Sequence, residues 1–287
     1  MQTTQKHWGG IWVWATAMTV AWNCIPAPTL AQPAETLIQQ GQAAYREGNY
    51  DASIALWRQL TEQEPDNAFA HAWLGFVLDQ TGDIEGAIAA YRSSIELNPD
   101  DPVTLNNLGN LLAVQGSLEE SIEVLQESVR LRPDYARAYN NLGISLRQNG
   151  QAEAAIAAYE RAIELDPEYP EVYDNLGIAL AAVGRLEESV SAHRRALDLG
   201  PDNPAIAYTN LGVSLFELGR LDAAIAAYQQ AIQLSPNYAL AYRNLGDALV
   251  AQSDPEGAIA AYRKALELNP DDNLARRRLE QLETPPE

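Results

Sequence analysis

A short motif that recurs at a nearly constant interval constrains the fold of this 287-residue chain more than any other feature. A proline marks each copy: Pro65, Pro99, Pro133, Pro167, Pro201, Pro236 and Pro270. The interval between successive prolines is constant except after Pro201, where one extra residue is inserted. A glycine recurs in step with these prolines: Gly41, Gly75, Gly109, Gly143, Gly177, Gly212 and Gly246. A fixed period of this kind predicts a solenoid of helical units, in which each unit buries its apolar face against its neighbours.

One copy of the motif divides into two short helices, here called helix A and helix B. In the fourth copy the apolar or small residues of helix A recur at i, i+3, i+4 and i+7: Tyr139, Leu142, Gly143 and Leu146. Helix B has an apolar side of its own: Ala155, Ile156, Tyr159, Ala162, Ile163 and Leu165. We expect Gly150 to end helix A and Pro167 to end helix B. Gly143 and Ala155 should let the two helices approach closely, and Tyr159 should fill the space between neighbouring pairs.

Polar residues at the expected helix starts predict how the helices are capped. Ser117 and Glu120 have the spacing of a capping box, in which each side chain accepts a hydrogen bond from the other residue's backbone N–H. Asp254 precedes a proline, which is typical of an N-cap before the first helical turn. The aspartate pairs that end in Asp101 and Asp272 each follow Asn-Pro, so we interpret them as turn formers and N-caps and not as catalytic acids.

These residues closely resemble the tetratricopeptide repeat family. The family pattern of aromatic, Leu, Gly, Leu, Gly, Ala, aromatic, Ala and Pro positions is met by Tyr139, Leu142, Gly143, Leu146, Gly150, Ala155, Tyr159, Ala162 and Pro167. The resemblance implies an all-α fold, namely a right-handed α-α superhelical solenoid of seven tetratricopeptide repeats with a C-terminal cap helix. The implied repeats cover residues 34–67, 68–101, 102–135, 136–169, 170–203, 205–238 and 239–272. The cap helix and tail take residues 273–287, with four apolar residues on one side of the helix: Leu274, Ala275, Leu279 and Leu282.

The N-terminal segment, from Met1 to Ala31, has the pattern of a signal peptide. Lys6 is followed by an apolar run at residues 11–22, which is long enough for a signal-peptide core and too short for a membrane span. Small residues at Thr29 and Ala31 favour cleavage after Ala31. We therefore expect an exported bacterial protein that lies in a periplasm or a lumen. Because residues 9–31 carry no charge, an uncleaved N-terminal membrane anchor is the alternative.

Charge and motif content argue against several functional classes. The chain has 39 acidic and 19 basic residues, and a formal charge of -20 disfavours binding to nucleic acid. No phosphate loop, zinc-ligand cluster or calcium-loop spacing occurs, so we expect no cofactor, no metal and no small-molecule substrate. His71 and His193 occupy positions that other copies fill with aromatic residues, so we interpret both as packing residues. The repeats account for nearly all of the chain after the leader, and we expect no enzymatic activity.

An asparagine recurs two residues before the motif glycine in five successive copies: Asn107, Asn141, Asn175, Asn210 and Asn244. The resemblance implies that this side of helix A faces the concave groove of the superhelix. An amide side chain both donates and accepts hydrogen bonds, so a row of asparagines predicts a ladder that holds an extended peptide backbone. The alternative is that each asparagine bonds to the neighbouring repeat and maintains the superhelix.

Further side chains are expected on the same groove face: Trp73, Phe76, Asn110, Ile144, Arg147, Ile178, Val213 and Phe216. Arg137 and Arg243 are additional basic candidates. Exposed aromatic residues in a groove are candidate hot spots for a partner. Trp73 and Phe76 also have a second interpretation, in which they cover the irregular first repeat. Because the chain is strongly acidic, the expected ligand is an extended, partly apolar segment that is neutral or basic.

The sequence therefore predicts an exported protein-protein interaction scaffold that binds an extended polypeptide in the concave groove of its repeats. One alternative is an assembly factor or chaperone for an envelope or photosynthetic membrane complex, which predicts co-fractionation with membranes. A self-associating structural protein, which predicts concentration-dependent oligomers, and a non-catalytic enzyme subunit are the remaining alternatives.

Overall fold

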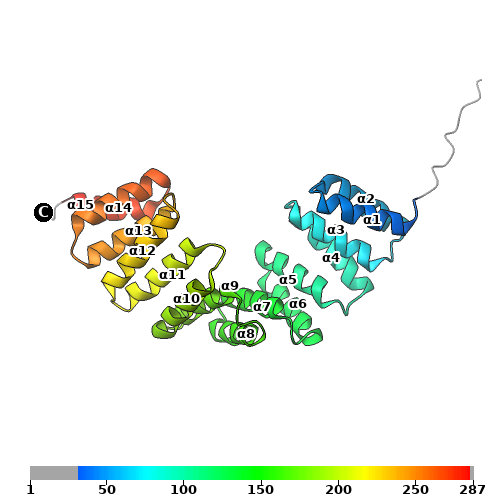
Figure 1. Cartoon of the computed structure of the whole chain (residues 1–287), viewed down its shortest axis with the longest axis horizontal. Helices are drawn as coiled ribbons and strands as arrows, with labels where there is room; N and C mark the ends of the chain where they lie inside the picture. The colour runs from blue at the N-terminus through cyan, green and yellow to red at the C-terminus, as the bar shows by residue number, and fades with distance from the viewer. Residues whose placement is uncertain (1–31, 285–287) are drawn as a thin grey trace, which may run out of the picture.

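The computed structural model describes residues 32–284, and every regular element in this range is an α-helix. The helices are α1 (Ala34–Arg46), α2 (Tyr50–Gln63), α3 (Ala68–Gln80), α4 (Ile84–Leu97), α5 (Pro102–Gln115), α6 (Leu118–Leu131), α7 (Ala136–Gln148), α8 (Ala152–Leu165), α9 (Pro170–Ala182), α10 (Leu186–Leu199), α11 (Pro204–Glu217), α12 (Leu221–Leu234), α13 (Ala239–Ala251), α14 (Pro255–Leu268) and α15 (Asn273–Glu283). All but α15 alternate as helix A and helix B of seven pairs (Figure 1). The predicted all-α repeat architecture is confirmed.

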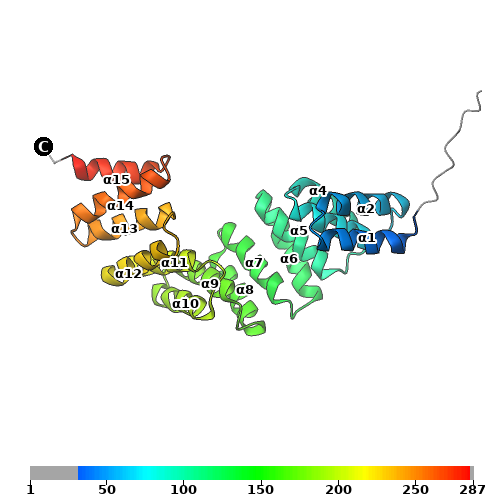
Figure 2. The ribbon, with the colours of Figure 1, turned by 45° about the horizontal axis from the view of Figure 1, so that its top comes forward.

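The seven helix pairs stack in chain order into an open arc, which Figures 1 and 2 show from two directions. Each helix packs against its partner in the pair and against the next helix along the chain. In Figure 1 the A helices α5, α7, α9 and α11 lie on the inner side of the bend, and the B helices α6, α8, α10 and α12 lie on the outer side. The inner surface of the arc is therefore built from A helices.

Close approach within each pair depends on the motif glycine. A Cβ atom at Gly143 would lie 2.5 Å from the ring of Tyr159, and one at Gly212 would lie 2.5 Å from the ring of Tyr228. Both tyrosine rings are almost completely buried. A side chain at the motif glycine would overlap the aromatic ring of helix B. Helix A can therefore pack this closely against helix B only because the glycine has no Cβ atom. The predicted close approach at Gly143 is confirmed, and the Tyr159 ring fills the space beside Gly143 within its own helix pair.

The aspartate N-caps are confirmed. The carboxylate of Asp254 accepts a hydrogen bond from the backbone N–H of Gly257 at 3.0 Å, and Asp272 accepts one from Ala275 at 3.0 Å. Asp101 accepts a hydrogen bond from the Val103 N–H, also at 3.0 Å. These bonds satisfy backbone donors that have no partner within the helix.

The predicted capping box at the start of α6 is wrong. The Ser117 side chain makes no capping hydrogen bond to the helix. The Glu120 carboxylate instead pairs with Arg92 of the preceding repeat, at 2.7 Å. A carboxylate forms a stronger hydrogen bond with a guanidinium than with a neutral backbone N–H, which explains why Glu120 turns toward the neighbouring repeat.

The helix α15 covers the C-terminal end of the solenoid, as the sequence predicts. Ala275, Leu279 and Leu282 pack against the last repeat, where Tyr262 is the largest buried side chain. Leu274 is expected on the same side but is 37% exposed, because it lies one position off the i, i+4, i+7 stripe that Ala275, Leu279 and Leu282 form. No described helix has the length and apolar character that crossing a membrane requires. The predicted signal peptide lies outside the described residues.

Candidate binding groove

Three of the five groove asparagines bond to the preceding repeat. The Asn141 Nδ2 atom donates to Asn106 Oδ1 at 2.9 Å, and the Asn175 Nδ2 atom donates to Asn140 Oδ1 at 3.1 Å. The Asn210 Nδ2 atom makes the corresponding bond to an oxygen of Asp174 at 2.9 Å. The three acceptors share one register, three residues before the motif glycine: Asn106, Asn140 and Asp174. These bonds correspond to the structural alternative, in which the amides link successive A helices.

The amide row is interrupted at both ends. Within the described residues, Asn244 makes no side-chain hydrogen bond to the preceding repeat, where Thr209 occupies the acceptor position and its hydroxyl donates to the Ala205 carbonyl. At the N-terminal end, Ala72 occupies the position three residues before Gly75, where the following repeats have Asn106 and Asn140. A methyl group cannot accept a hydrogen bond, so Asn107 has no acceptor at this position in the preceding repeat. The Asn107 Oδ1 atom accepts a hydrogen bond from Asn106 at 3.2 Å, whereas its Nδ2 atom donates to no residue in the range 32–284.

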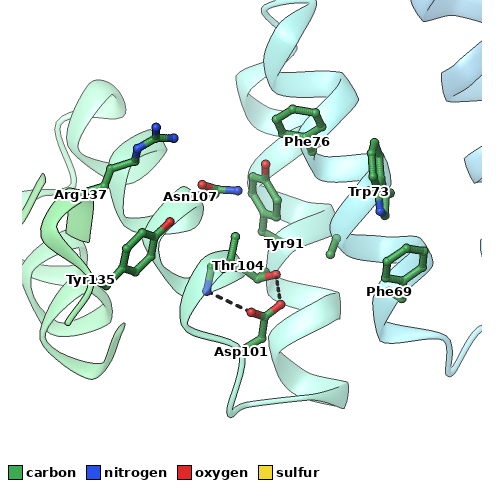
Figure 3. A pocket seen from close by; sticks show the side chains of 11 residues that line it. Phe69, Trp73, Phe76, Tyr91, Asp101, Thr104, Asn107, Tyr135 and Arg137 are labelled. Atoms are coloured by element: carbon green, nitrogen blue, oxygen red, sulfur yellow. Dashed lines mark hydrogen bonds between the residues drawn. The ribbon is translucent and has the colours of Figure 1, made fainter. Parts of the chain in front are cut away.

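A pocket of about 400 Å³ opens beside Asn107 and Ala72 (Figure 3). Its residues come from α3, α4, α5 and the start of α7: Phe69, Ala72, Trp73, Phe76, Tyr91, Asp101, Val103, Thr104, Asn107, Tyr135 and Arg137. Figure 3 shows three aromatic rings from α3 on one side, Tyr135 and Arg137 on the opposite side, and Tyr91 and Asn107 between them. We call this space the anchor pocket.

The aromatic wall of the anchor pocket is supported from behind by the first repeat. The Trp73 ring stacks on the fully buried Trp57 ring, with centroids 5.3 Å apart and an angle of 13° between the ring planes. Phe76 packs against Tyr45 at a centroid distance of 5.1 Å. Trp73 and Phe76 therefore cover the first repeat, as the second interpretation requires, and the sides that remain accessible line the pocket.

Two important pocket residues escaped the sequence-based prediction. Phe69 is 47% exposed, and its register is that of Val103 and Arg137 in the next two repeats. An exposed phenylalanine at a position that is variable between repeats is a signal that could have identified it. Tyr91 belongs to the buried framework of helix B, so nothing in the repeat pattern distinguishes it from Tyr159.

The Tyr91 hydroxyl is buried without a hydrogen-bond partner among the described residues. Only 1% of the residue is exposed, and Figure 3 shows the Asn107 amide turned toward this hydroxyl. Burial and the nearby Asp79 carboxylate raise the pKa of the Tyr91 phenol. The Asn107 amide nitrogen, which points toward the phenol oxygen, lowers this pKa by a smaller amount. The hydroxyl therefore keeps its proton at neutral pH and is available as a donor.

The charged residues at the pocket differ in how fully they are paired. Both Asp101 oxygens are occupied, one by the Val103 N–H and the other by the Thr104 hydroxyl at 2.6 Å. Arg137 is exposed and makes no ion pair with a described residue. Elsewhere in the groove, Arg243 bonds to Asp272 at 3.1 Å, so this predicted basic candidate is engaged with the N-cap of the cap helix.

The remaining predicted groove residues lie outside the anchor pocket. Asn110 is exposed, and four others are half-buried: Ile144, Ile178, Val213 and Phe216. Arg147 is half-buried, and its Nε atom has no hydrogen-bond partner in the part of the chain that the structure describes. The structure thus brings Trp73, Phe76 and Asn107 together in one pocket and distributes the other predicted residues along the arc.

Both histidines have structural roles, as predicted. The His71 Nε2 atom lies 3.0 Å from the Pro65 carbonyl oxygen, and Tyr173 makes the corresponding bond to Pro167 at 3.2 Å. His193 is buried in the slot that Tyr159 fills in the preceding repeat, and its Nδ1 atom lies 2.6 Å from Asp174. In residues 32–284, no group of three or more His, Cys, Asp or Glu side chains has the arrangement of a metal site.

Comparison with known proteins identifies the family. A tetratricopeptide repeat family model, described as the cilia and flagella-associated protein 70 C-terminal domain, matches residues 29–282. The chain belongs to the tetratricopeptide repeat family. No curated protein sequence matches the chain.

Solved structures of other tetratricopeptide repeat proteins share the fold. The chain resembles a chain in the crystal structure of the APC/C hetero-tetramer Cut9-Hcn1. The TM-score is 0.69 and the identity 19%, and the match covers 87% of this chain and 52% of the Cut9-Hcn1 chain. The present chain thus spans about half the length of that relative. A tetratricopeptide repeat protein from Parabacteroides merdae matches with a TM-score of 0.69 and 18% identity, covering 88% of this chain and 99% of that one. YrrB, described as a TPR protein with an unusual peptide-binding site, matches with a TM-score of 0.54 and 25% identity, covering 67% of this chain and 98% of that one.

Proposed function

We propose that this tetratricopeptide repeat protein is a non-catalytic interaction scaffold that holds an extended segment of another polypeptide on the inner face of its A helices. The observation that carries this proposal is the anchor pocket. It combines exposed aromatic surface with unpaired polar groups, which is the composition of a site that binds peptides or ligands and not of a solvated surface.

Two further observations support a polypeptide ligand. The pocket opens between successive A helices, so a chain that follows the inner face can place one side chain in it and continue along the arc. The related structure of YrrB is described as having a peptide-binding site. Scaffolds of this kind need no cofactor, because affinity comes from buried aromatic contacts and from hydrogen bonds to the peptide backbone.

Site-specific photo-crosslinking in the source cells tests this function. A photoreactive phenylalanine analogue at Val103, which is 38% exposed in the pocket, is expected to link to one continuous segment of a partner polypeptide. The matched control places the same analogue at Ala157, an exposed position on α8 on the outer side of the arc. Mass spectrometry of the linked peptides identifies the partner segment. Equal products from both positions, or products from Ala157 alone, would place binding away from the inner face.

We also propose that the protein is exported and that its leader is removed after Ala31. The apolar run in residues 11–22 and the small residues at Thr29 and Ala31 support this proposal. N-terminal sequencing of the protein from its source cells should then begin at Gln32. Recovery of an intact N-terminus in the membrane fraction would instead indicate an uncleaved anchor.

A further inference from the structure

The anchor pocket lies where one repeat lacks the hydrogen-bond acceptor that the next three repeats carry. In repeats four and five the side-chain amides of Asn141 and Asn175 each donate to an asparagine oxygen of the preceding repeat, at 2.9 and 3.1 Å. For Asn107, the asparagine of repeat three, the equivalent acceptor position is occupied by Ala72, which itself lines the pocket. Ala72 therefore leaves the Asn107 amide without this acceptor and contributes only a methyl group to the pocket wall.

Two hydrogen-bond donors therefore face the same space. One is the Nδ2 group of Asn107, and the other is the hydroxyl of Tyr91, which is buried without a partner among the described residues. A buried hydroxyl without a partner costs free energy in the unbound protein, so a ligand that supplies an acceptor gains that energy on binding. The group that suits both donors is a carbonyl oxygen.

The rest of the pocket suits an aromatic side chain. Trp73 already contacts Phe69 and Phe76 edge to face, with centroid distances of 6.2 and 5.6 Å. Another aromatic ring can extend this cluster, because aromatic pairs favour such tilted contacts at about 4.5–7 Å. Trp73 is fixed by stacking on Trp57, so the wall loses little side-chain entropy when a ligand binds.

We infer that the anchor pocket receives an aromatic side chain of an extended peptide, and that Asn107 and Tyr91 donate to a main-chain carbonyl beside that residue. This inference rests on the proposed scaffold function and assigns the chemistry of its ligand. Within repeats three to six, Asn107 is then the ligand-binding member of the amide row, whereas Asn141, Asn175 and Asn210 hold the repeats together.

The net charge of the protein favours some residues over others beside the aromatic residue of the bound peptide. The chain carries 39 acidic and 19 basic residues, and Asp101 at the pocket is already saturated by its capping bonds. Arg137 is the single basic residue that lines the pocket, and Figure 3 shows it on the side opposite Trp73. A segment with basic flanks is therefore attracted to the protein as a whole, one with neutral flanks is neither attracted nor repelled, and an acidic segment is repelled.

Selection from a phage-displayed library of random dodecapeptides tests the inference on the purified full-length protein. The expected result is a set of binding peptides that share one aromatic position within neutral or basic flanks. Synthetic versions of these peptides are then titrated by calorimetry, and alanine at the aromatic position is expected to weaken binding about 30-fold or more, as hot-spot truncation does.

Two protein variants separate binding from folding. Tyr91→Phe removes the unpaired hydroxyl and should weaken peptide binding about 2- to 10-fold, with an unchanged or higher melting temperature. The matched control is Tyr159→Phe, because the Tyr159 hydroxyl is also buried without a partner among the described residues but does not line the pocket. Ala72→Asn should restore the missing acceptor, pair with Asn107 and abolish binding while the protein stays folded.

The possible outcomes distinguish this inference from the proposed function. Peptides without a shared aromatic residue, or peptides that bind the Ala72→Asn variant as tightly as the parent, would overturn the anchor chemistry and leave the scaffold function standing. Failure of the parent to select any peptide would contradict the scaffold function itself, and the inference with it. Equal weakening by Tyr91→Phe and Tyr159→Phe would show that the hydroxyl acts through general packing, which also overturns the inference.

Discussion

Replacement of Trp57 by alanine is expected to unfold the first helix pair while the C-terminal repeats stay folded. Trp57 is fully buried, its ring would lie 2.9 Å from a Cβ atom at Gly41, and it stacks on Trp73. Truncation of a buried tryptophan costs about 3–5 kcal/mol. In a solenoid each repeat contacts only its neighbours, so this loss falls on α1 and α2. Hydrogen exchange measured by mass spectrometry should show fast exchange in α1 and α2 and unchanged protection in α13 and α14.

The Trp57→Tyr variant is the matched control, because tyrosine fills the equivalent slot in repeats two, four, six and seven. It should retain protection in α1 and most of the thermal stability. Loss of protection throughout the chain in Trp57→Ala would show that the solenoid unfolds as one cooperative unit, contrary to this prediction. The same variant removes the support behind Trp73, so its affinity for the selected peptides should fall as well.

Replacement of Asp174 by alanine is expected to destabilise the middle of the solenoid by about 2–4 kcal/mol, because two polar groups lose their partner. The Asp174 carboxylate accepts from Asn210 at 2.9 Å and lies 2.6 Å from Nδ1 of the buried His193. A buried polar group without a partner costs about 1–3 kcal/mol. Chemical denaturation, with hydrogen exchange to locate the effect in α9 to α11, measures the loss.

A double substitution provides the control for the Asp174 prediction. Asp174→Asn with His193→Tyr reproduces the arrangement of the preceding repeat, where Asn140 accepts from Asn175 and Tyr159 fills the slot beside Gly143. This variant should be about as stable as the parent, because the introduced amide again accepts from Asn210 and the introduced tyrosine fills its slot as Tyr159 does in the preceding repeat. A double variant as unstable as Asp174→Ala would show that the carboxylate contributes something other than these two contacts.

The repeated helix pairs could be predicted from the sequence because their pattern is local. The stripe at Tyr139, Leu142, Gly143 and Leu146 encodes one helix face, and Gly150, with a φ of 76° shortly after α7 ends, allows the chain to turn back. The Cβ overlap at Gly143 confirms the steric reason for the glycine. Interactions between residues three or four positions apart determine these features, so they can be read from one stretch of sequence.

The side chains that connect repeats could not be assigned from the pattern alone. Ser117 and Glu120 have the spacing of a capping box, but Glu120 pairs with Arg92, which lies 28 residues earlier in the chain. Phe69 and Tyr91 entered the candidate site only when the structure placed them around one pocket. In each case the outcome depends on a partner in another helix, and spacing within one helix carries no information about that partner.

The row of asparagines shows most directly which features the sequence determines and which depend on the tertiary structure. The repeat period alone establishes that the chain forms seven helix pairs with an asparagine at one register position in five successive A helices, because each copy repeats the same local contacts. Which of these amides is free depends on the tertiary structure. Asn141 and Asn107 are alike in sequence, but Asn106 accepts from the first, and Ala72 offers no acceptor to the second. A hydrogen bond between repeats depends on both partners, and their pairing is established only when neighbouring helices pack.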